Sequence, residues 1–145
     1  MKNNKWTREE LIIAFNLYCK IPFARIHIRN PDIIELASAF GRTPSSVSWK
    51  LANFARLDPA LQQRNIKGAT HGSKGEEEIW KEFHSNWDRL AFESEKYLAN
   101  LLHKPIEKIA EIETDDLPKE GKERESVVKV RVNQQFFRKS VLAAH

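Results

Sequence analysis

The stretch that decides the fold is residues 41–56, GRTPSSVSWKLANFAR. Thr43 carries a hydroxyl that can accept a hydrogen bond from the free amides of a first helical turn. Pro44 suits the first helical position, because its missing N–H has no helical partner there in any case. The apolar residues that follow share one side of such a helix: Val47, Leu51, Phe54 and Ala55. We therefore predict a short helix with one side in a core.

The opposite side of this helix is polar. Its members are small, amide, cationic or aromatic: Ser45, Ser46, Trp49, Lys50, Ala52, Asn53 and Arg56. In a DNA major groove, Asn can read adenine, and Arg or Lys can read guanine or hold phosphate. The pattern fits a helix that reads DNA, and it fits equally well a solvated helix of a small bundle. Trp49 either stacks on DNA or packs on a later helix.

A first helix is predicted from Thr7 to about Lys20. Thr7 and Glu10 have the spacing of a capping box, in which each side chain bonds the other's backbone amide. Trp6, directly before the cap, is expected to pack in the core.

A second helix has a start signal and a stop signal. Asn30 is a cap, Pro31 takes the first helical position, and Gly41 is a left-handed terminator. Only Gly41 and Arg42 separate this helix from Thr43. Such a short turn makes the two helices cross steeply, as in a helix-turn-helix unit.

The connector between the first two helices, residues 21–30, alternates cations with apolar residues. This alternation predicts a short extended segment whose basic side faces solvent or phosphate. Arg25 and Arg29 are the candidate phosphate contacts, whereas His27 has no partner at a metal-ligand spacing.

The charge is unevenly distributed along the 145 residues. Residues 1–74 carry 12 Lys and Arg against 5 Asp and Glu, a net charge of +7. Residues 75–145 carry 12 against 15, a net charge of −3. A basic first half favours binding to phosphate groups, although many soluble domains have a similar charge without a nucleic-acid role.

The second half begins with a predicted long helix over residues 76–103, after a basic linker that contains a single helical turn near Pro59. A seam of mainly apolar residues recurs along that helix at alternating spacings of three and four: Trp80, Phe83, Trp87, Leu90, Ser94, Tyr97 and Leu101. This seam is expected to pack on the first three helices, with dimerisation as the alternative.

Residues 105–126 are charged and contain two prolines, which predicts a tether. Valines at 127–132 predict a brief strand or arm before a last helix.

A resemblance to a known family rests on the first 60 residues. Trp6, a short second helix and GRTPSSVSWKLANF together resemble a Myb/SANT three-helix unit, although the 21–30 connector is atypical for that family. In that family the helix after this turn enters the major groove. The resemblance implies that duplex DNA is contacted by Arg42, Ser45, Ser46, Trp49, Lys50, Asn53 and Arg56.

A second resemblance lies at the end of the chain. The pattern R-x-x-x-V-K-V-R-V-x-Q-x-x-F-R-x-x-V-L-A-A over residues 124–144 is similar to the segment before the HNH nuclease domain of predicted bacterial restriction endonucleases. In those proteins a His-Asn-His metal site follows. The resemblance therefore implies that a divalent metal and the catalytic residues lie beyond residue 145.

Within the chain itself, the sequence indicates no catalytic residue, metal site or cofactor. No two of the five histidines share a metal-ligand spacing, and no glycine-rich phosphate loop is present. The one cysteine, Cys19, fits a reducing cytoplasm. No apolar run approaches the roughly 20 residues of a membrane span, and residues 1–10 lack a secretory signal.

We therefore expect a mainly α fold divided into a three-helix DNA-binding unit (1–60), a linker and long helix packed on it (61–104), a tether (105–126), and an arm and helix (127–145). The expected function is target recognition for an HNH restriction-type endonuclease. The alternatives are a free-standing Myb-like regulator that dimerises through helix 76–103, and a SANT-like module that binds protein.

Overall fold

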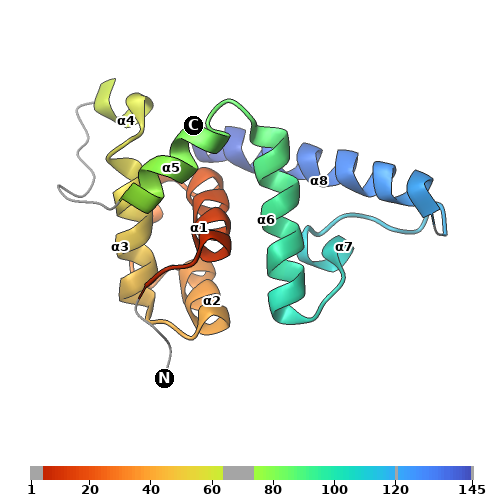
Figure 1. The fold of residues 1–145 in the computed structure, drawn as a ribbon, viewed down its shortest axis with the longest axis horizontal. Helices are drawn as coiled ribbons and strands as arrows, with labels where there is room; N and C mark the ends of the chain where they lie inside the picture. Colours follow the sequence, from red (N-terminus) through yellow and green to blue (C-terminus); the bar gives the residue numbers. More distant parts are fainter. Residues whose placement is uncertain (1–4, 64–73, 120, 145) are drawn as a thin grey trace.

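Helix α1 lies against most of the other long helices of an all-helical fold (Figure 1). The computed structural model describes residues 5–63, 74–119 and 121–144, and no strand occurs in these ranges. The elements in chain order are α1 (Arg8–Lys20), the 3₁₀ turn η1 (Phe23–Arg25), α2 (Pro31–Phe40), α3 (Pro44–Ala55), α4 (Pro59–Gln63), α5 (Lys74–Phe83), α6 (Trp87–Leu102), α7 (Ile106–Ile109) and α8 (Gly121–Ala144).

The start and stop signals of the first three helices are confirmed. Thr7 and Glu10 form the expected capping box at the start of α1. Asn30 Oδ1 accepts hydrogen bonds from the amides of the first turn of α2. Gly41 ends α2 with φ of 68°, in the left-handed region where a side chain would add strain. Local capping chemistry therefore sets these boundaries.

The core is centred on Phe15 of α1, which is fully buried. Its ring stacks on Phe54 of α3 with centroids 4.9 Å apart. Trp80 and Trp87 approach the same ring, with centroids at 5.3 and 5.9 Å. The second half of the chain therefore packs on the first three helices, as the apolar seam predicted.

The prediction of one unbroken helix over residues 76–103 was wrong. The helix breaks between Phe83 and Trp87, and α5 and α6 run in different directions (Figure 1). Trp80 of α5 and Trp87 of α6 nevertheless both pack on Phe15, so the two helices reach the same core residue from either side of the break.

The strand predicted near residues 127–132 was also wrong, because α8 is helical from Gly121 onward. Val128, Val132 and Phe136 are buried and lie four residues apart, on one face of the helix. The sequence pattern contains both this spacing and a two-residue alternation of valines. Packing of α8 on α1 and α6 selects the helical one.

The two connecting segments also differ from the expectation. The 21–30 connector contains the η1 turn and is not uniformly extended. Ala110 and Leu117, within the expected tether, are buried in the same core cluster as α1. The described residues therefore share one apolar core.

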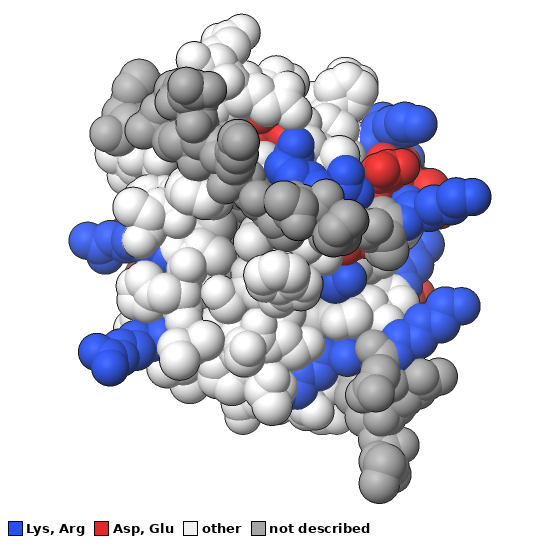
Figure 2. Space-filling view, turned by 90° about the vertical axis from the view of Figure 1, so that its left-hand side faces the viewer, with Lys and Arg blue, Asp and Glu red and all other residues white. Residues whose placement is uncertain are grey.

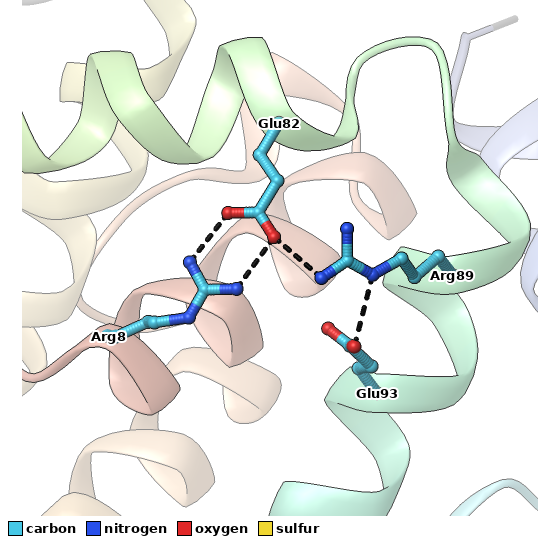
Figure 3. A network of polar contacts seen from close by, with 4 residues as sticks. All are labelled: Arg8, Glu82, Arg89 and Glu93. Atoms are coloured by element: carbon cyan, nitrogen blue, oxygen red, sulfur yellow. Dashed lines mark hydrogen bonds and ion pairs between the residues drawn. The ribbon is translucent and has the colours of Figure 1, made fainter.

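A surface ion-pair network joins α1, α5 and α6 (Figure 3). Arg8 donates to both carboxylate oxygens of Glu82, each at 2.6 Å. Arg89 reaches Glu82 at 2.9 Å and Glu93 at 3.1 Å. This network attaches the last turn of α5 to the start of α1.

Across the described ranges, none of the helices combines the length and the apolar character needed to cross a bilayer.

Candidate nucleic-acid interface

The candidate interface is α3 together with the turn that precedes it. Thr43 Oγ1 accepts a hydrogen bond from Ser46 N at 3.1 Å, and Pro44 occupies the first helical position. The Arg42 amide bonds to Ala37 O at 2.9 Å, which completes the short turn after α2. Val47 and Leu51 are fully buried. The predicted helix and its apolar side are therefore confirmed.

Arg42, an expected DNA contact, points inward and joins the turn before α3 to α1. Its Nε donates to Glu10 Oε2 at 3.0 Å and its Nη2 to Glu10 Oε1 at 3.1 Å. The guanidinium also lies over the Trp6 ring, 4.5 Å from the centroid. The side chain of Arg42 is only 7% exposed, so its role in this arrangement is structural.

Lys50 and Asn53 are held by the first turn of α5. Lys50 Nζ and Asn53 Nδ2 both donate to Glu76 Oε1, at 3.0 and 2.7 Å. Glu76 is fully buried. Burial alone would raise the pKa of this carboxyl, but the bonds from Lys50 and Asn53 outweigh that effect and lower the pKa.

Arg56 is held by the next glutamate of the same turn. Its Nη2 donates to Glu77 Oε1 at 3.2 Å. Three cationic or amide side chains of the predicted polar side are therefore covered by α5, which contradicts their expected exposure. The negative charge of these glutamates, opposite to that of the polar side of α3, was the sequence signal that could have paired the two segments.

Ser45 and Trp49 remain outside this contact. Ser45 is exposed, and Ser46 is half-buried. Trp49 is 61% exposed and does not belong to the core cluster of the described residues. The alternative that it packs on a later helix is therefore not supported by the described part of the chain. Ser48, directly before Trp49, and Ala52, three residues after it, are half-buried. We call the residues Ser45, Ser48, Trp49 and Ala52 the open strip of α3.

Arg25 and Arg29 are both exposed. Neither side chain forms an ion pair with the described residues. Figure 2 looks onto the side of the molecule that carries α3 and α4, where much of the described surface is uncharged. Lys and Arg occur at the edges and also within this face, some of them beside Asp and Glu.

The structure also contains one cavity of about 280 Å³, lined by residues of α1, α2, α6, α7 and α8 and by none of α3. The pair Lys20–Glu95 lies in its wall, so these two charges already compensate each other. Within the described ranges, no three His, Cys, Asp or Glu side chains gather as a metal site would require.

The basic linker predicted before residue 76 falls mainly on residues 64–73, outside the described part of the chain.

No family model, curated protein or solved structure matches this chain.

Proposed function

We propose that this protein binds duplex DNA through the open strip of α3. The observation that carries the proposal is Trp49, a large aromatic side chain that is 61% exposed on the second helix of a tight helix-turn-helix unit. Exposing such a ring to water is unfavourable, and a partner that covers it recovers that free energy. The small side chains beside it permit close approach of the helix to a groove.

Two exposed arginines in the connector before α2 support the same partner. Arg25 and Arg29 are exposed and available to phosphate groups. Such contacts position a protein on DNA without reading its sequence, whereas groove contacts from α3 supply sequence preference. Binding of this kind releases counterions and weakens as salt increases.

The larger context that we propose is target recognition for an HNH restriction-type endonuclease in the bacterial cytoplasm. The support is the similarity of residues 124–144 to the segment that precedes such nuclease domains. The divalent metal and the hydrolytic residues would then belong to the HNH domain, outside this chain.

A second candidate function, a module that binds protein, is favoured by a different observation. Lys50, Asn53 and Arg56 contact the carboxylates of α5, which shows that this side of α3 accommodates an acidic helix. Dimerisation through residues 76–103 has less support, because Phe83 and Leu90 of the seam are already buried within the chain.

The test is a titration of a fluorescently labelled duplex at about 50 and about 200 mM salt. We expect binding that weakens steeply with salt, and Trp49→Ala should weaken it at least about tenfold, the effect of losing one good groove contact. Phe137→Ala is the matched control, because Phe137 is an aromatic residue that is 68% exposed on α8. Undetectable binding, or equal losses in both variants, contradicts a DNA interface on α3.

A further inference from the structure

The polar edge of α3 is occupied by carboxylates where DNA would place phosphates. Glu76 accepts from Lys50 and Asn53, and Glu77 accepts from Arg56. These two consecutive glutamates therefore cover the three side chains of α3 that are chemically best suited to a nucleic acid.

The contact leaves some of its polar atoms without partners. Asn53 Oδ1 and Arg56 Nε are buried, and neither has a hydrogen-bond partner among the described residues. A buried polar group without a partner is unfavourable. An adenine edge could donate to Asn53 Oδ1 and accept from Nδ2 together, which Glu76 cannot do, because a carboxylate only accepts.

The two halves of α5 are held in different ways. Ile79 and Phe83 are buried in the core, and Glu82 is paired with Arg8 (Figure 3). The first turn, in contrast, contacts α3 through the Glu76 and Glu77 carboxylates, which accept hydrogen bonds from side chains of α3. Charges that are removed from water in such pairs regain solvation when they separate. The first turn can therefore leave α3 while the rest of the helix stays packed.

We infer that the first turn of α5 is a displaceable clamp, and that DNA binding replaces Glu76 and Glu77 with phosphate groups and base edges. This inference rests on the proposed function. The open strip makes the first contact with DNA, and release of the clamp adds Lys50, Asn53 and Arg56 to the interface.

The experiment compares duplex binding by the full chain with binding by three variants: Glu76→Gln, Glu77→Gln and Glu78→Gln. Glu78→Gln is the matched control, since Glu78 is exposed on the same turn and no ion pair with the described residues involves it. We expect Glu77→Gln to bind duplex DNA about fivefold tighter than the unsubstituted chain. A plot of the logarithm of the binding constant against the logarithm of the salt concentration should also become steeper by about one, because the released Arg56 adds one phosphate contact. Glu78→Gln should change affinity less than about twofold, although it removes the same charge.

A second substitution separates the clamp from a general charge effect. Adding Arg56→Gln to Glu77→Gln should return the affinity to that of the unsubstituted chain, because the gain depends on that guanidinium. Because Glu76 is buried, thermal unfolding must first show that Glu76→Gln folds. If that variant does not fold, the test uses Glu77→Gln alone, because Glu77 is half-exposed.

The outcomes are distinct. If binding depends on Trp49 but is unchanged or weakened by Glu77→Gln, the clamp proposal is wrong and the proposed DNA interface on α3 is retained. Equal gains in Glu77→Gln and Glu78→Gln also overturn the clamp. Failure of the unsubstituted chain and of every variant to bind overturns the DNA-binding proposal together with the clamp.

Discussion

Arg42 and Glu10 form a buried, bidentate ion pair that joins the turn before α3 to the first turn of α1. Glu10 Oε1 also accepts from the Thr7 amide at 3.0 Å, so one carboxylate serves the helix cap and the turn together. The orientation of α3 therefore depends on a helix-capping side chain that lies 32 residues before Arg42 in the chain.

Replacing Arg42 with Met should lower the free energy of unfolding by about 3 kcal/mol, because the buried Glu10 carboxylate loses both of its hydrogen bonds from the guanidinium. Urea denaturation measures this loss. Arg29→Met is the control, and because Arg29 is exposed its effect should stay within about 0.5 kcal/mol. Equal, small losses in both variants would show that the pair contributes nothing to stability.

Replacing Trp49 with Ala should leave the free energy of unfolding within about 0.5 kcal/mol of its original value, because the ring is mostly in water. The fluorescence of the folded protein should become less sensitive to quenching by acrylamide, since Trp6 and Trp80 are partly buried and Trp87, at 40% exposed, is less accessible than Trp49. A large loss of stability would mean that Trp49 is part of the core.

Replacing Phe15 with Ala should lower the free energy of unfolding by about 3 to 5 kcal/mol, the usual range for a fully buried aromatic ring. The loss arises because Phe54, Trp80 and Trp87 all contact this one ring. Phe137→Ala, at an exposed position, should change stability little by the same chemical denaturation. A mild effect at Phe15 would contradict a core shared by both halves of the chain.

Stability should decrease as the pH falls below about 4.5, the ordinary pKa of a glutamate. The pKa of Glu82 is lowered, chiefly by its hydrogen bonds from Arg8, and that of Glu76 is lowered by Lys50 and Asn53 against the opposing effect of burial. Groups with a lowered pKa stabilise the fold above their unfolded pKa, and that contribution disappears as pH falls through the folded value.

Urea denaturation at a series of pH values measures this dependence, and Glu82→Gln should reduce its slope. The matched control is Glu78→Gln, on the same helix and exposed. An unchanged slope in Glu82→Gln would show that the network in Figure 3 does not contribute to the acid sensitivity.

The candidate site was predictable only in part. The position of α3, its cap at Thr43 and its apolar side follow from residues close together in the chain, and all three are present. Which of its polar residues reach solvent depends on α5, which begins about 20 residues later. Helical spacing alone could not tell Trp49, which is exposed, from Asn53, which is buried under Glu76.

The sequence by itself determined the helices that begin with Thr7, Asn30 and Thr43, because a cap and the amides it binds lie within one turn of each other. Only the tertiary structure decided the break after Phe83 and the helical form of residues 127–132. In both segments the local pattern allows more than one conformation, and burial against α1 selects between them. The same distant packing decided which part of α3 remains open to a partner.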